Sequence, residues 1–515
     1  MNRVAKSFIG ALLLMNTGVA FSEEALWKEV TLAPRQAVED LSGARYFDSN
    51  ELALRQLLTL APAEHSGQSN NISLPMPDGT LARYRIFESS IMEDELAVKF
   101  PDIKSYKVFG IDDPGASGRL DMSPRGFRAM VSTAEGRVFI DPVENSLVAG
   151  RYLSRTRPTR GAEQAFQCSA NELPQNQSTI LSRSAIKTTS LRVPGNYVTY
   201  RLAVSATFQY VNAFDGTLGT ALAEINTAIN RVNEFYERDL GIRLILVANN
   251  DRIIDVNNTA GFTDNDGFNL LSQNQVWIDR VDKIGTANYD IGHIFSTGGG
   301  GVAALAAACD STSKAQGVTG RGTPDGDVFY IDFVAHEIGH QFGAEHTFNG
   351  STDSCNGNRT ASNSVEPGSG STIMAYAGIC GAENLQNNSD ATFNARSIEQ
   401  INTFVSSSAG SCNALVSITN PSEPTANGGT DKTIPMQTAF KLTGVGTDAD
   451  GDTLSYQWDQ QDTGSATTAA TLGDDLGDNA LFRSYAPQTS GERDFPALGT
   501  QLNGLIDRSE VIPCT

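Results

Sequence analysis

The sequence predicts an α/β (α+β) domain in the middle of the chain, between a β-rich segment and a β-sandwich. Residues 197–210 alternate between apolar and polar as a strand does, and an apolar stripe at helical spacing follows, formed by Leu222, Ile225, Ile229, Val232 and Phe235. Gly241 stands where a helix ends, and residues 242–247 follow as a buried strand. This order predicts a mixed, twisted sheet with helices packed against it.

The two flanking segments are typical of β structure. Residues 23–190 mix short alternating runs, such as 137–140, with turn sequences such as 77–79. The stretch 154–190 is polar, which indicates a linker, and its basic residues Arg155 or Arg160 would be exposed sites for proteolysis. Residues 417–515 are rich in Thr, Gly and Asp, and the runs 439–442 and 454–458 predict short strands of a sandwich that we expect to be incomplete.

The charge balance excludes two classes of partner. The 515 residues include 59 acidic and 38 basic side chains, for a net charge of −21. Nucleic-acid binding and attachment to anionic membranes both depend on Lys and Arg, so neither is expected.

The first 22 residues predict a secretory signal peptide. Arg3 and Lys6 precede an apolar run over 8–20, and Ala20 and Ser22 supply small residues before the expected cleavage site. The run is too short for a transmembrane helix, so no membrane insertion is expected after cleavage. We therefore predict a secreted protein, in a compartment where its six cysteines can pair.

The segment 336–346 has the pattern of a catalytic metal site. His336 and His340 are four residues apart, so on a helix both imidazoles project from one face. Gly343 can take the left-handed conformation that ends the helix and returns His346 as a third ligand. Three protein ligands leave one position on Zn²⁺ for water, and Glu337 is placed to take a proton from that water.

The alternative is three ordinary histidines satisfied in a core or on a surface. The extended pattern HExxHxxGxxH is far more specific than HExxH alone. The chain has only five histidines, and three of them fall within this short segment. This concentration favours the metal site.

With these residues the chain resembles the metzincin clan of zinc metallopeptidases. In that clan a Met-turn follows the zinc motif, and the sequence Ser371-Thr-Ile-Met-Ala-Tyr376 stands at a matching distance. The resemblance implies that Met374 forms the apolar floor below the histidines. It also implies a place for Tyr376 near the metal, as an extra ligand or as a donor to the oxyanion, with a simply packed tyrosine as the alternative.

Within the clan the chain is most similar to secreted bacterial reprolysin-like (adamalysin-type) proteases. Residues 73–142 resemble their propeptide, which implies a latent precursor, and the last region resembles the Ig-like domain that such proteins append. Residues 290–301 resemble the upper edge strand and the loop after it. The resemblance implies a peptide substrate that adds to the strand 291–296 by main-chain hydrogen bonds.

The resemblance also gives roles to the cysteines. It implies one disulfide between Cys309 and Cys412 and a second between Cys355 and Cys380. Cys168 lies before the linker, where a propeptide thiolate could occupy the open position of the zinc, although the surrounding sequence differs from the vertebrate switch. Cys514 has no evident partner in the sequence.

Three further patterns leave alternatives open. Asp448, Asp450 and Asp452 could chelate Ca²⁺, but they lack the last glutamate of an EF-hand loop and fit a solvated turn equally well. Residues 299–304 imitate part of a dinucleotide fingerprint, which is weak without an assured βαβ unit, so a loop beside the substrate is favoured. His293 is expected to be a satisfied edge-strand side chain.

These observations predict a secreted zinc-dependent endopeptidase that acts on proteins or peptides and is made as a latent precursor. Its parts would be a signal peptide (1–22), a propeptide and linker (23–190), the catalytic domain (191–415) and an Ig-like sandwich (417–515). The alternative is an exported, adhesin-like binding protein with a structural zinc site. The sequence does not indicate an oligomeric state.

Overall fold

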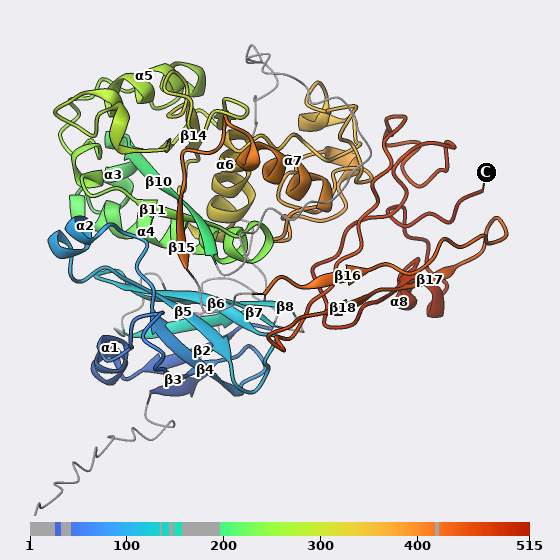
Figure 1. Ribbon diagram of the computed structural model, residues 1–515, viewed down its shortest axis with the longest axis horizontal. Coiled ribbons are helices and arrows are strands. Elements are labelled where there is room, and N and C mark those ends of the chain that lie inside the picture. The colour runs from blue at the N-terminus through green and yellow to red at the C-terminus, as the bar shows by residue number, and fades with distance from the viewer. Residues whose placement is uncertain are drawn as a thin grey trace, which may run out of the picture.

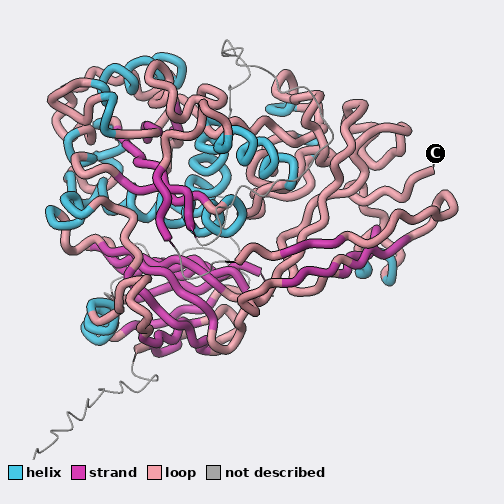
Figure 2. Tube along the Cα trace, in the orientation of Figure 1, coloured by secondary structure: helices cyan, strands magenta, loops and turns pink. Residues whose placement is uncertain are grey.

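The computed structural model describes residues 26–31, 43–133, 136–143, 148, 150–156, 196–417 and 422–514. A large N-terminal sheet lies against a helix-rich central part, and the C-terminal region lies beside them (Figure 1). Figure 2 shows that most helix belongs to the central part. The predicted signal peptide, Arg160 and Cys168 lie outside the described residues. No helix in the described ranges is long and apolar enough to cross a membrane.

The N-terminal part is a nine-stranded antiparallel sheet. In spatial order its strands are β1 (Trp27–Val30), β2 (Arg45–Ser49), β9 (Arg151–Arg155), β8 (Gly136–Pro142), β7 (Gly126–Thr133), β6 (Ser117–Ser123), β5 (Lys104–Gly110), β4 (Leu81–Glu88) and β3 (Asn70–Pro75). Two helices accompany it, α1 (Glu51–Thr59) and α2 (Asp94–Lys99). Asn50 begins α1, because its side chain accepts from the amide of Ala53 at 3.1 Å.

The central part is built on a mixed sheet of six strands. In spatial order they are β11 (Ile242–Leu246), β10 (Asn196–Ala206), β12 (Ile291–Ser296), β14 (Gly317–Gly320) and β13 (Gly301–Ala303), and β15 (Ala414–Ser417) pairs with the first half of β10. Only β13 and β15 run antiparallel to their neighbours. The mixed α/β class predicted for this segment is therefore present.

The edge strand is not where the sequence placed it. Strand β12 lies between β10 and β14, and all six of its residues are buried. Gly299 and Gly300 have positive φ angles of 84° and 68°, and the chain returns after them as β13 on the far side of β14. The expectation that residues 291–296 form the edge is wrong. Strand β14 pairs with β12 on the side away from β10, and β13 then forms the edge of the sheet.

Two glycines predicted to end helices, Gly241 and Gly343, do so. The sequence does not otherwise delimit the helices of the central part. They are α3 (Phe208–Ala213), α4 (Leu218–Phe235), α5 (Gly267–Asp279), α6 (Ala335–Gln341), α7 (Ala395–Ser406), the π-helical η3 (Tyr236–Leu240) and η6 (Val328–Val334), and the 3₁₀ turns η4 (Asn250–Arg252), η5 (Thr286–Asn288), η7 (Asp353–Cys355) and η8 (Gly381–Glu383). The strand predicted to reach residue 210 ends at Ala206, because Thr207 caps α3. Gly241, with a φ of 66°, ends η3 as predicted.

Helix α4 is buried on both faces. Its apolar stripe packs into the central core. Its polar face contacts β6 and β7 of the N-terminal sheet. There Arg128 pairs with Glu224 at 2.9 Å, and Arg119 bonds Glu237 of η3. The N-terminal sheet therefore covers a surface that a solvated amphipathic helix would expose to water.

Arg155 belongs to the same interface and corrects a prediction. Its guanidinium lies 3.0 Å from both Asp141 and Asp327, and its side chain is 14% exposed. It is therefore no exposed proteolytic site. It stands at the end of β9, where the sequence alone suggested the start of a polar linker.

The C-terminal region contains little regular structure. Its described elements are β16 (Thr425–Asn427) paired with β18 (Val445–Thr447), β17 (Phe440–Thr443) paired with β19 (Glu492–Phe495), and α8 (Leu498–Leu502). The run predicted at 439–442 coincides with β17, whereas 454–458 forms only a bridge between Tyr456 and Gln488. The Ig-like sandwich stays a prediction.

Candidate metal centre

The helix that carries the histidines is continuous from η6 into α6 and is buried. It ends at Gly343, whose φ of 90° is the left-handed conformation, and the amide of Ala344 donates to Gly339 O at 3.0 Å. Gly339 is also required by its surroundings, because a Cβ there would lie 2.5 Å from the Met374 sulfur. The turn at Gly343 brings His346 back towards the helix.

The three predicted histidines converge. His340 Nε2 lies 3.1 Å from His336 Nε2 and 3.1 Å from His346 Nε2. The candidate ligand atoms of all three rings lie within 4.8 Å of one another. Each side chain is at most 1% exposed. One helical turn and one chain reversal therefore place three imidazoles around a single point.

Backbone carbonyls orient all three rings. His336 Nδ1 donates to Ile373 O, His340 Nδ1 to Ala344 O and His346 Nδ1 to Asn358 O, each at 2.7 Å. Because a carbonyl only accepts, the proton is on Nδ1 and the lone pair of Nε2 points to the centre. Such partners fix the tautomer and ring orientation of metal-binding histidines.

The electrostatics of the centre favour neutral rings. Burial lowers the pKa of His336 to about 4, and burial together with the neighbouring histidines lowers the pKa values of His340 and His346 well below the ordinary range. Neutral imidazole is the form that binds a metal ion. Three neutral nitrogens with their outer nitrogens already bonded fit Zn²⁺, and they fit Ca²⁺ poorly because it takes oxygen ligands.

Met374 and Tyr376 line the centre as the resemblance implied. Met374 is fully buried with its sulfur against Gly339. The Tyr376 ring lies 4.6 Å from the His346 ring and stacks on Phe348 at 4.4 Å, measured between centroids. Glu337 is on α6 next to His336 and is fully buried. Met374, Phe348 and Tyr376 are the apolar and aromatic side chains beside the imidazoles, and Glu337 adds a carboxylate.

A small pocket opens beside His336. The residues that line it come from the helix and from the segment after the Met-turn: Asp332, Phe333, His336, Ala375, Tyr376, Ala377, Ile379 and Ser389. Asp332 accepts from the amide of Ser389 at 3.1 Å, which joins the two walls. Polar and apolar side chains both line this small pocket.

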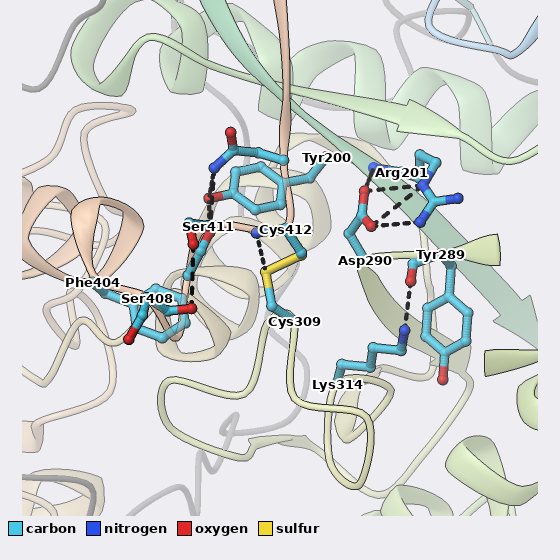
Figure 3. The surroundings of a disulfide bond; sticks show 12 residues. Tyr200, Arg201, Tyr289, Asp290, Cys309, Lys314, Phe404, Ser408, Ser411 and Cys412 are labelled. Carbon is cyan, nitrogen blue, oxygen red and sulfur yellow. Dashed lines mark hydrogen bonds and ion pairs between the residues drawn. A yellow bond between two sulfur atoms is a disulfide. The ribbon is translucent and has the colours of Figure 1, made fainter. Parts of the chain in front are cut away.

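Both implied disulfides are present, and each supports a segment that contacts the centre. Cys309 pairs with Cys412, and Figure 3 shows the amide of Cys412 donating to the Cys309 sulfur. The same loop reaches the end of α6, where the amide of Ala306 donates to His340 O at 2.9 Å. Cys355 pairs with Cys380 and so joins the loop that contains Asn358 to the chain after the Met-turn.

The remaining predicted residues lie elsewhere. His293 is buried, and its ring nitrogens bond Gln341 and Thr319 at 2.9 Å each, so it is a satisfied side chain of an interior strand. Asp448, Asp450 and Asp452 lie together in the C-terminal region, away from the histidines, and two of their amides bond Asp448 Oδ1. Calcium binding there stays a prediction.

Sequence reasoning missed one buried acid close to the centre. Glu366 is fully buried between the third histidine and the Met-turn, and both of its oxygens accept hydrogen bonds. It stands alone in a stretch of Ser, Val, Pro and Gly, with no spacing that marks it. The only feature of the sequence that could have identified it is its position, because it is a carboxylate between His346 and the Met-turn.

The comparisons with known proteins agree with this geometry. Residues 197–404 match the model of the reprolysin-like family M12B of metallo-peptidases. The match spans strands β10 to β14, α4, the three histidines and the Met-turn, and it ends before β15. This segment is therefore a reprolysin-like metzincin domain. No curated protein matches the sequence at a significant level.

Proposed function

We propose that the protein is a secreted zinc-dependent endopeptidase that hydrolyses peptide bonds in proteins. The observation that carries this proposal is the convergence of three carbonyl-oriented Nε2 atoms within the domain that matches the family. His336, His340 and His346 would hold the zinc. When bound, zinc supplies Lewis-acid chemistry, polarising the scissile carbonyl and lowering the pKa of water.

Glu337 is the general base in this proposal. It is adjacent to a ligand on the same helix and buried, so its carboxylate is close to the reacting water. It takes the proton of the attacking water and later gives a proton to the leaving amine. Tyr376, whose ring lies beside His346, would donate to the oxyanion that develops on the carbonyl.

The substrate peptide would add to β13. This strand is the edge of the sheet, and both β13 and the loop after it contact α6. An extended peptide could bond the edge through its main chain and lie beside the helix that carries His336. The interior position of β12 rules it out for this role.

The N-terminal sheet would be the propeptide of a latent precursor. The polar stretch that follows β9, up to residue 190, would supply the linker where maturation cuts. Cys168, which the structure does not describe, would bind the zinc through its thiolate until that cut is made. The proposed domain limits are 23–190, 191–415 and 417–515. Because β15 (Ala414–Ser417) pairs with β10, the catalytic domain would extend to residue 417.

The binding-protein alternative is less favoured. It requires the metal site to be structural only, with the work done by the C-terminal region. A structural zinc site is closed by four protein ligands, whereas this cluster has three histidines among the described residues.

The first prediction tests the chemistry with a matched pair of variants. We expect the full chain, cut between residues 157 and 195, to bind equimolar zinc and to cleave casein in a chelator-sensitive way. Glu337→Gln should keep the zinc and lose activity by at least roughly a hundredfold, because the base is removed. Glu345→Gln is the control, since Glu345 accepts from Gln400 of α7 instead. Bound zinc without Glu337-dependent cleavage would refute the peptidase.

A further inference from the structure

Glu366 accepts hydrogen bonds from two separate segments of the centre. One carboxylate oxygen accepts from Thr347 Oγ1 at 2.6 Å and from Thr372 Oγ1 at 2.5 Å. The other accepts from the amides of Ser371 and Thr372 at 2.9 and 3.2 Å. Because each oxygen already faces two donors, the side chain is used fully as an acceptor.

The first of these segments begins at the third histidine. Thr347 directly follows His346, and it bonds in three directions. Its amide donates to Met374 O at 3.1 Å, its carbonyl accepts from the amides of Val365 and Glu366 at 2.9 Å each, and its hydroxyl reaches the Glu366 carboxylate. The position of His346 is therefore coupled to Glu366 through a single residue.

The second segment leads into the Met-turn. Ser371 and Thr372 precede Ile373, whose carbonyl orients His336, and Met374, whose sulfur packs on Gly339. The amides of Ser371 and Thr372 are held by one oxygen of Glu366. A shift of this segment would therefore move both the partner of His336 and the apolar floor.

We propose that Glu366 is a positioning residue that fixes His346 and the Met-turn relative to each other and so sets the geometry of the metal site. The inference rests on the proposed function, because it assumes that the three histidines bind zinc. Glu366 touches no ligand ring itself, and it acts through Thr347 and through the backbone of residues 371–372.

Glu383 provides a matched control within the same part of the molecule. It is also fully buried, and it accepts from the amide of Ser351 at 2.8 Å and from Thr467 Oγ1 at 3.2 Å. Thr467 belongs to the C-terminal region, and neither donor is the residue after His346. Removal of either carboxylate leaves buried donors unsatisfied, so both variants should lose stability, but only one should alter the metal site.

The experiment compares Glu366→Gln, Glu383→Gln, Thr347→Val and Thr347→Ser in the full chain, with Zn²⁺ and Co²⁺ as probes. Far-ultraviolet circular dichroism identifies a temperature at which each variant is folded. At that temperature zinc release to a chelator and the visible spectrum of the cobalt form are measured. Neither readout requires peptidase activity.

We expect Glu366→Gln and Thr347→Val to release zinc roughly 10-fold faster and to shift the cobalt spectrum, since partners of this kind change metal affinity by about 10–100-fold. Thr347→Ser should restore the parent values because it keeps the hydroxyl, and Glu383→Gln should not change them. The positioning role is overturned if Thr347→Val and a folded Glu366→Gln both keep the parent zinc-release rate and cobalt spectrum, as Glu383→Gln is expected to do. A Glu366→Gln chain that does not fold leaves the decision to the Thr347 pair.

Two outcomes separate this inference from the proposed function. A parent chain that binds neither ion overturns both. A parent chain that binds zinc but cleaves no protein overturns the peptidase, while the release rates and cobalt spectra still decide the role of Glu366.

Discussion

The central domain contacts its two neighbours through chemically different interfaces. Towards the N-terminal sheet it buries ionised groups: Glu237 meets Lys107 and Arg119 from the sheet, together with Arg243 of its own strand β11. Towards the C-terminal region its hydrogen bonds have at most one charged partner among the described residues, as in Thr467 Oγ1 on the Glu383 carboxylate at 3.2 Å and Asn349 Nδ2 on Ser465 O at 2.9 Å. Among the described residues no ion pair joins the central domain to 422–514, whereas several cross to the N-terminal sheet.

This difference predicts how the stability of each interface responds to the loss of one side chain. A buried charge that loses its partner keeps the full cost of desolvation. Loss of any one buried charged side chain should therefore destabilise the N-terminal interface. A hydrogen bond between two neutral groups contributes little net free energy, so the C-terminal interface should tolerate the loss of one such bond. The polar face of α4 therefore depends on the N-terminal sheet, and the C-terminal contacts do not impose a comparable requirement.

The largest effect is expected from Glu237→Gln. The variant leaves Lys107, Arg119 and Arg243 facing one another without their carboxylate, and we expect it to lower the free energy of unfolding by about 3–5 kcal/mol. Urea titration of the full chain measures the change. The control is Glu492→Gln, because the Lys441–Glu492 pair is about half exposed and should cost under about 1 kcal/mol. Equal losses in the two variants would show that burial of the ion pair does not decide its contribution to stability.

An intermediate and pH-dependent effect is expected from Glu64→Gln. Burial by itself raises the pKa of Glu64, but its bonds to Arg243 and the charge of Lys107 lower that pKa to about 2 from an ordinary 4.5. A lowered pKa means that the ionised form stabilises the fold, by about 2–3 kcal/mol at neutral pH. This contribution is complete above about pH 4.5 and is lost as the pH falls towards 2.

The measurement is the difference in unfolding free energy between the parent and Glu64→Gln along a pH series. It should be constant above about pH 5 and shrink below that value. A difference that stays constant down to about pH 3 would show that Glu64 acts by packing and not by its charge.

The smallest effect is expected from Ser351→Ala at the C-terminal interface. Ser351 Oγ donates to Thr467 O at 2.7 Å, and its loss should cost about 1 kcal/mol, the net value of a neutral hydrogen bond. Thermal unfolding of the full chain detects such a change. A loss as large as that of Glu237→Gln would mean that the C-terminal contacts are as interdependent as the ionic ones.

Local sequence patterns predicted the site more completely than its surroundings. The spacing of His336, His340 and His346 with Gly343 is a property of one helix and one turn, and the structure reproduces it. The apolar stripe of α4 gave the helix and one buried face. The strand 291–296 was also correctly identified as a strand, but a local pattern cannot show which strand lies next to it.

The errors concern neighbours that are distant in the sequence. Arg155 reads as a solvated linker residue until Asp327, from another domain, is placed beside it. Glu366 is nearer in sequence to its partners Thr347 and Ser371, but no spacing pattern indicates that its side chain contacts them. The apolar stripe of α4 did not predict that its polar residues are buried too, because partners such as Arg128, 96 positions from Glu224, are distant along the chain.

By itself the sequence determined the metal-binding helix, the turn at Gly343 and the candidate base, because neighbouring residues on one helix fix those relations. The tertiary structure alone decided the edge strand β13, the ionic interface and the hydrogen bonds of Glu366. These depend on which surfaces meet after folding. A buried charge or an unpaired strand edge is defined only by the groups that lie against it, and those come from distant parts of the chain.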